Sequence, residues 1–241
     1  MMKALLGIVI FAMSVCAQAA VSIKPLDPVD VDVFDLKSVR RGAGYYVNYC
    51  AGCHSIKHLR YSRIGQDLGL KEEDLRRDLM VGEAKLQDSL LSAMAKEDGE
   101  KWFGVPPPDL SLVARSRGAK WLYGYLRGFY LDPATPTGVN NIVYPNSAMP
   151  NVFWDLQGTQ KAVIKKQGGA DVIEGLALVD QGKMSPRDFD RAMADLVSFL
   201  VYAGEPAQYE RLRLGKYVLF GLIILAIIFY RLKKAYWKDI D

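Results

Sequence analysis

Two cysteines and a histidine lie close together in the sequence Cys50-Ala51-Gly52-Cys53-His54. This C-x-x-C-H spacing lets two thiols add across the two vinyl groups of one haem, and it leaves the next imidazole facing the iron. The motif therefore predicts one covalent haem c, attached through Cys50 and Cys53 and bound at the iron by His54.

The same two thiols could instead form a redox dithiol or half of a zinc site. A dithiol of the thioredoxin type belongs in a βαβ setting, and a structural zinc site needs a second pair of ligands. The other cysteine and histidine of the chain are Cys16 and His58. Both alternatives therefore run short of ligands, and the haem interpretation is favoured.

The other side of the iron needs a second ligand if the protein is an electron carrier, whereas binders and oxidases leave that position open. Met80, Met94 and Met193 fall in helix-prone stretches, where a methionine usually fills a core. Met149 stands in a loop stiffened by prolines, and a pre-ordered loop loses less entropy in closing on a metal. We predict Met149 as the ligand, followed by Met184 and then by His58, which is too close to His54.

The N-terminus resembles a secretory signal peptide, with Lys3, an apolar stretch and the cleavage sequence Ala17-Gln18-Ala19. We expect residues 1–19 to be removed, and Cys16 with them. The remaining cysteines then both belong to the haem motif, so disulfides do not stabilise the exported domain.

The C-terminal part contains a long apolar stretch around residues 217–230, flanked by basic residues. Residues 211–232 are long enough for one transmembrane helix. The basic residues of the 233–241 tail and the export signal place this tail in the cytoplasm and residues 20–210 in the periplasm, with the single span in the bacterial inner membrane.

Positive charge is concentrated at the membrane borders. Residues 211–241 hold seven Lys or Arg against two Asp, although the net charge of the whole chain is only +4. The exported domain is therefore mildly acidic, which argues against nucleic acid as a partner and leaves the lipid bilayer as the partner of the basic segments.

The pattern predicts a mainly helical exported domain. Helices are expected over residues 39–48 with Ser38 as the N-cap, over 72–94 and over 114–129. A further helix should begin after Ser185 at Pro186 and bury Met193, Leu196, Val197 and Leu200. Residues 132–151 are rich in Pro, Gly and Asn and are expected to form an irregular loop.

The order of motifs along nearly the whole chain resembles the cytochrome c1 family, the haem subunit of ubiquinol-cytochrome c oxidoreductase. The resemblance rests on the export signal, the haem motif, Pro107-Pro108-Asp109-Leu110-Ser111, Pro136-Thr137-Gly138-Val139, Met149-Pro150, Glu205-Pro206 and the final membrane helix. It implies a class I cytochrome c-like haem domain with extra loops.

The resemblance also implies functional residues. Cys50 and Cys53 attach the haem, His54 and Met149 are the axial ligands, and an arginine after the Pro-Pro-Asp-Leu-Ser motif lies near a haem propionate. Both Arg115 and Arg117 fit this last role, and Arg117 is preferred. The walls of the haem crevice are expected to be formed by Pro107 and Pro108 and by the aromatic residues Trp121, Tyr123 and Tyr125.

The implied function is electron transfer from a Rieske iron-sulfur protein to a soluble or tethered cytochrome c, beside cytochrome b in a dimeric complex. The chain itself would carry no catalytic residues and make no bonds. Two alternatives stay open: a membrane-tethered cytochrome c that shuttles electrons, and a haem sensor with an open sixth position. A tethered shuttle usually has a smaller haem domain and an N-terminal anchor.

Overall fold

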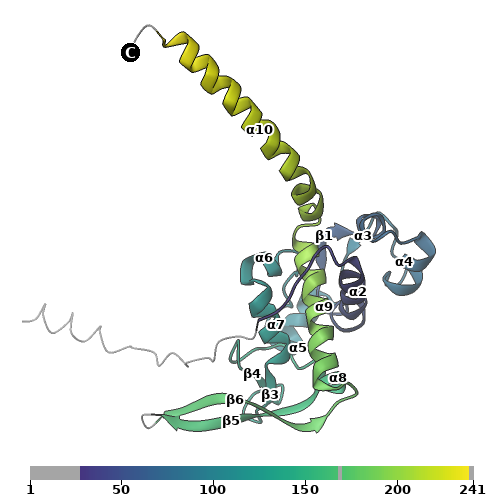
Figure 1. Cartoon of the computed structure of the whole chain (residues 1–241). Helices are drawn as coiled ribbons and strands as arrows, with labels where there is room; N and C mark the ends of the chain where they lie inside the picture. The colour runs from purple at the N-terminus through teal and green to yellow at the C-terminus, as the bar shows by residue number, and fades with distance from the viewer. Residues whose placement is uncertain (1–27, 168–169, 239–241) are drawn as a thin grey trace, which may run out of the picture.

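The computed structural model describes residues 28–167 and 170–238 (Figure 1). The predicted signal peptide, with Cys16, lies outside the described residues. Mainly helical structure is confirmed. The helices are α2 (Leu36–Tyr49), α3 (Tyr61–Leu68), α4 (Glu72–Asp78), α5 (Lys96–Phe103), α6 (Val113–Arg117), α7 (Ala119–Arg127), α8 (Trp154–Gln157), α9 (Pro186–Gly204) and α10 (Gln208–Tyr236).

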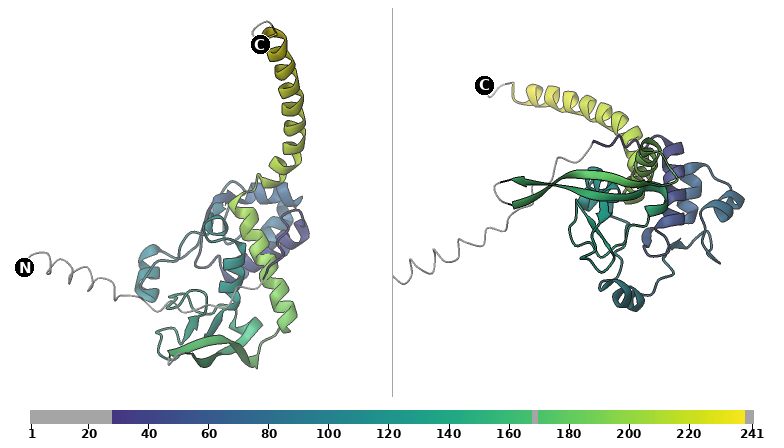
Figure 2. Two further views of the ribbon diagram at one scale, coloured as in Figure 1. Left: turned by 60° about the vertical axis from the view of Figure 1, so that its left-hand side comes forward. Right: turned by 90° about the horizontal axis from the view of Figure 1, so that it is seen from below.

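The described residues also form three antiparallel two-stranded sheets. Their strands are β1 (Ile56–Arg60) with β2 (Ser89–Leu90), β3 (Phe129–Leu131) with β4 (Val139–Asn141), and β5 (Gly158–Gln167) with β6 (Ala170–Gln181). The β5–β6 hairpin extends from the end of the domain remote from α10, and it was not predicted (Figures 1 and 2).

Helix α9 runs through the middle of the domain and packs against α2 (Figure 1). It begins as predicted, because the Ser185 hydroxyl accepts a hydrogen bond from the Asp188 amide at 3.2 Å and Pro186 occupies the first turn. Its predicted apolar face is confirmed as core, with Met193, Leu196, Val197 and Leu200 all buried.

Helix α2 begins earlier than predicted, and Ser38 is not its N-cap. The Asp35 carboxylate accepts hydrogen bonds from the amides of Lys37 and Ser38, at 3.0 and 3.2 Å. The Ser38 hydroxyl instead donates to Asp195 of α9 at 2.6 Å. The Ser38 hydroxyl is therefore used in a contact between α2 and α9, and not in capping α2 as the local pattern predicts.

Two other predicted helices are shorter than expected. The prediction over 72–94 was wrong beyond Asp78, because the chain turns back there and Leu90 pairs with Ile56 of β1. Met94 accordingly precedes α5 and is not helical. The single helix predicted over 114–129 is in fact two helices, α6 and α7. Gly118 lies between them, and its φ of 85° is incompatible with a continuous helix.

The loop over residues 132–151 is largely irregular, as predicted, except for strand β4. Residues of β4 pair with β3 in register, with Asn141 opposite Phe129 and Asn140 opposite Tyr130. This short sheet attaches the start of the Met149 loop to the end of α7.

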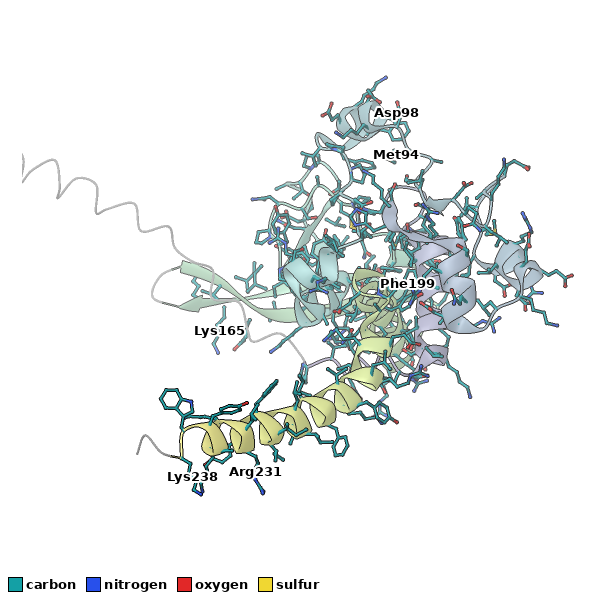
Figure 3. The ribbon with its side chains drawn as sticks, turned by 90° about the horizontal axis from the view of Figure 1, so that it is seen from above. Met94, Asp98, Lys165, Phe199, Arg231 and Lys238 are labelled. Atoms are coloured by element: carbon teal, nitrogen blue, oxygen red, sulfur yellow. The ribbon has the colours of Figure 1, made fainter. Side chains whose placement is uncertain are left out.

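Helix α10 leaves the domain after a three-residue connection, Glu205 to Ala207. Its segment Glu210–Tyr236 contains an 18-residue window with a mean hydropathy of 2.1 and is long enough to cross a membrane, at about 40 Å for 27 residues. Arg231 and Lys238 lie toward its far end, away from the buried Phe199 at the domain centre (Figure 3). The single candidate span found in the described residues agrees with a membrane-anchored protein.

Candidate haem site

The C-x-x-C-H motif forms a compact turn at the C-terminal end of α2. The Cys50 amide donates to the Tyr46 carbonyl at 2.8 Å, and the amides of Cys53 and His54 donate to the Cys50 carbonyl at 3.0 and 2.8 Å. The hydroxyl of the buried Tyr46 donates to the His54 carbonyl at 2.7 Å. Hydrogen bonds to the backbone and side chain of Tyr46 in α2 therefore hold the motif in place.

The Cys50 side chain is buried and that of Cys53 is partly exposed. Burial raises the pKa of Cys50 to about 12, and burial also raises the pKa of Cys53. Reactive dithiols instead lie where the thiolate is stabilised, such as at a helix N-terminus. This setting at a helix C-terminus therefore disfavours the redox-dithiol alternative.

The His54 ring is oriented by the proline motif predicted to form a wall of the crevice. Its Nδ1 lies 2.8 Å from the carbonyl oxygen of Pro108. Because a carbonyl only accepts, Nδ1 carries the hydrogen and Nε2 keeps its lone pair. Burial holds the pKa of His54 below its ordinary value, outweighing the opposing effects of Pro108 and Asp109. A neutral, oriented imidazole is the form that binds a metal.

The Pro108 segment is in turn held against β1. The Asp109 carboxylate accepts hydrogen bonds from the amides of Lys57 and Ser111, at 3.1 and 2.9 Å. The Leu110 amide donates to the Ser55 carbonyl at 2.8 Å. These bonds join the residues after His54 to the residues after Pro108, so the orienting carbonyl and the imidazole belong to one rigid unit.

An apolar cavity, partly open to solvent, adjoins this unit. His54, Cys53, Pro108 and Met149 line it, so the structure brings together four of the predicted site residues. The remaining lining residues are Tyr49, Phe103, Val105, Pro106, Pro107, Ala148, Pro150 and Val152.

The predicted wall residues Trp121, Tyr123 and Tyr125 do not line this cavity, and several residues that do line it were not predicted. Phe103 and Val105 flank Gly104, where α5 ends, and Tyr49 immediately precedes the haem motif. The proximity of Tyr49 to the motif was an available signal. Nothing local distinguishes Phe103 or Val152 from ordinary apolar residues, because only the fold brings them to the cavity.

The competing ligands lie elsewhere. His58 is exposed on β1, and its amide donates to the Ser111 hydroxyl at 3.2 Å. Met184 lines a separate hollow beside α2 with Tyr45 and Tyr49, and its amide donates to the Leu156 carbonyl at 3.0 Å. Met193 is completely buried in the core. Met149 is the methionine found with His54 in the described cavity.

The two candidate arginines have different surroundings. Arg115 donates to the Glu205 carboxylate at 2.8 Å, at the connection to α10. The Arg117 guanidinium lies over the rings of Trp121 and Tyr144, at 5.1 and 5.8 Å from their centroids. Neither lines the cavity, but Arg117 contacts the loop that carries Met149.

The residues present fit a haem. The cavity is apolar, two cysteines have the attachment spacing, and the imidazole has one nitrogen left for a metal. These features, together with one candidate membrane helix, define a membrane-anchored c-type haem protein.

Comparison with known proteins identifies the family. A profile of the Cytochrome C1 family matches residues 29–240, and the chain belongs to that family. Its haem is covalent haem c, and its function is that of the electron-transfer haem subunit of the bc1 complex. The family membership does not favour the shuttle or sensor alternatives.

Three relatives show how far the similarity extends. Cytochrome c1 of Allochromatium vinosum is 49% identical over 218 residues, covering 89% of each chain. A protein of Nitrosomonas europaea named ammonia monooxygenase gamma subunit is 41% identical, covering 100% of this chain and 99% of its own. Mitochondrial cytochrome c1 of Neurospora crassa is 26% identical, covering 85% of this chain and 63% of its own.

Proposed function

We propose that this chain carries one electron at a time from a Rieske iron-sulfur protein to a soluble or tethered cytochrome c, within a dimeric complex that also contains cytochrome b. The observation that carries the proposal is the shared cavity of His54 and Met149, with the His54 ring oriented by Pro108. A haem with histidine and methionine ligands supplies a one-electron couple of high potential and needs no bond-making residues.

Each site residue has a defined task in this proposal. Cys50 and Cys53 would form the thioether attachments, and His54 Nε2 and the Met149 sulfur would bind the iron. The Pro108 carbonyl keeps the imidazole in one tautomer and one orientation. Arg117 is the candidate for a haem propionate, since Arg115 is already paired with Glu205.

The proposed location is the bacterial inner membrane, with the haem domain over residues 20–210 in the periplasm. Covalent haem attachment to an exported domain, the basic tail after residue 232 and the one candidate span within residues 28–167 and 170–238 support this orientation. The break between α9 and α10 supports a boundary between the haem domain and the membrane helix near residue 210, because α9 ends at Gly204 and α10 begins at Gln208.

Purification of the native protein from gently solubilised membranes tests the proposed complex. A b-type cytochrome and an iron-sulfur protein should copurify with it, and added quinol should reduce its haem. Purification with subunits of an ammonia-oxidising enzyme would instead support the function in the name of the Nitrosomonas relative. Purification as a single haem protein would support the tethered-shuttle alternative.

A further inference from the structure

Two consecutive asparagines at the end of β4 lie buried beneath the loop that carries Met149. Asn141 is 0% exposed and Asn140 is 8% exposed. Buried amide side chains are costly unless their donors and acceptors are satisfied. The bonds that satisfy them therefore indicate what these two residues hold in place.

Asn141 connects the loop to the end of α7. Its Nδ2 donates to the Tyr125 carbonyl at 2.8 Å, in the last turn of that helix. Its Oδ1 accepts hydrogen bonds from the amides of Val143 and Tyr144, at 2.8 and 3.1 Å. One side chain thus fixes the first turn of the loop to a core helix.

Asn140 holds the next turn. Its Oδ1 accepts hydrogen bonds from the amides of Asn141 and Asn146, both at 2.8 Å, and its Nδ2 donates to Asp132 at 2.9 Å. Asn146 has a φ of 60°, the one positive value at a non-glycine position in the described residues. This hydrogen bond offsets part of the cost of that conformation.

Side chains of α7 also contact Tyr144 and Ser147 of the same loop. The hydroxyls of Tyr125 and the buried Ser147 lie 2.7 Å apart. The Tyr144 ring packs edge-on against Trp121, with centroids 6.3 Å apart. Apart from the Asn141 amide, the anchored groups fall within residues 143–147. The next three residues, Ala148, Met149 and Pro150, line the cavity.

We infer that Asn140 and Asn141 are positioning residues that hold Met149 in reach of the haem iron. The inference rests on the proposed ligand role of Met149 and deepens it. Iron-thioether bonds are weak, so the sulfur stays bound only if the loop loses little entropy in closing. The two asparagines supply that order through four accepted backbone amides.

The test uses the full-length holoprotein in detergent with Asn141→Leu and Asn140→Asp. Asn141→Leu removes the hydrogen-bond donor and acceptor of the side chain while keeping a side chain of similar size. Asn140→Asp keeps the acceptor but places a second carboxylate against Asp132. Each variant should retain covalent haem and admit carbon monoxide in the ferrous state at least about tenfold faster. Loss of one hydrogen bond, as in Asn140→Asp, already corresponds to a factor of about this order, and Asn141→Leu loses three. The sulfur-to-iron charge-transfer band should weaken, and amides 143, 144 and 146 should exchange hydrogen faster.

A reciprocal swap gives the rescue. In the double variant Asn140→Asp with Asp132→Asn, the amide introduced at position 132 can donate to the carboxylate introduced at position 140, and the acceptor for the Asn146 amide is preserved. Carbon monoxide access and amide exchange should then return toward wild type. Asn48→Leu is the matched control, since Asn48 also bonds a backbone carbonyl, that of Gly44, but outside this loop. It should change neither readout.

The outcomes separate this inference from the proposed ligation. If Met149→Leu opens the iron to carbon monoxide but the asparagine variants do not, Met149 is the ligand and the positioning role is wrong. If Met149→Leu leaves the charge-transfer band intact, the ligand assignment itself fails. Equal acceleration of amide exchange throughout the domain in the asparagine variants would show general destabilisation and would also overturn the positioning role.

Discussion

Gly42 of α2 lies directly against the backbone carbonyl of Asp195 in α9. A Cβ atom at position 42 would overlap that carbonyl and would come 2.8 Å from the Cβ of Phe199. The Asp195 carboxylate also accepts bonds from the Ser38 hydroxyl at 2.6 Å and from Arg41 at 2.6 and 2.8 Å. The two central helices are thus held at their closest approach by one glycine and one aspartate.

Gly42→Ala should therefore destabilise the protein, by roughly 1–3 kcal/mol, because the added methyl group forces α2 and α9 apart. Gly44→Ala is the matched control, since nothing lies within 4 Å of its Cβ position. It should stabilise the helix by up to about 1 kcal/mol. Denaturant unfolding of both variants checks this, and equal stabilities would contradict the close packing.

Met149→Leu should keep covalent haem but lose the thioether ligand. The midpoint potential should fall by on the order of 100 mV, a fraction of the ~0.8 V that axial ligands span, and external ligands should bind. Redox titration and carbon monoxide difference spectra check both effects. Met184→Leu serves as the control, because Met184 lies in a different hollow. An unchanged potential in Met149→Leu and a lowered one in Met184→Leu would reverse the assignment.

Asp109 should make the stability of the site depend on acid pH. Burial raises the pKa of this carboxyl, but hydrogen bonds from Ser111 and Lys57 outweigh that effect and leave the pKa below its ordinary value. Its stabilisation is therefore complete at neutral pH and is lost as the pH falls below about 4, through the lowered folded-state pKa.

Asp109→Asn should flatten this part of the acid profile, measured as the urea midpoint of the full chain at a series of pH values. Asp98→Asn, on the exposed first turn of α5, should leave the profile as it is in the wild type. A variant profile at position 109 that stays parallel to wild type would show that Asp109 is not linked to acid unfolding.

A reporter fused after Asp241 should report a cytoplasmic C-terminus. Alkaline phosphatase should be inactive there and a fluorescent protein should be bright, since only the second folds in the cytoplasm. The same two reporters fused after Ala207, before α10, should give the opposite pattern. Active phosphatase at the C-terminus would disprove the single-span orientation.

Sequence alone predicts those parts of the structure whose signals are local. Ser185, Pro186 and Asp188 define the start of α9 within four residues, and the structure agrees. The Pro, Gly and Asn content of residues 132–151 correctly predicts a largely irregular loop. The placement of Met149 in the same cavity as His54 depends on the fold, and here the resemblance to a family added what spacing could not.

Other features depend on contacts between distant segments. The β5–β6 hairpin was missed because lysines interrupt the apolar alternation of β5, although Gly168-Gly169 between the two runs is a hairpin signal. The burial of Asn140 and Asn141 could not be predicted, since asparagine in a loop is usually solvated. Likewise, Arg115 and Arg117 are separated by contacts with distant segments, Glu205 for Arg115 and the Tyr144 ring for Arg117.

The short connection between α9 and α10 determines which components of an electron-transfer chain can move. Glu205 accepts bonds from Arg115 at 2.8 Å and from Arg211 at 2.9 Å, so this junction is attached to both α6 and the membrane helix. We expect this three-residue connection and its ion pairs to restrict how far the haem domain moves relative to its anchor. If the height of the redox centre above the bilayer varies little, the diffusive search for a productive distance falls to the electron donor and the acceptor.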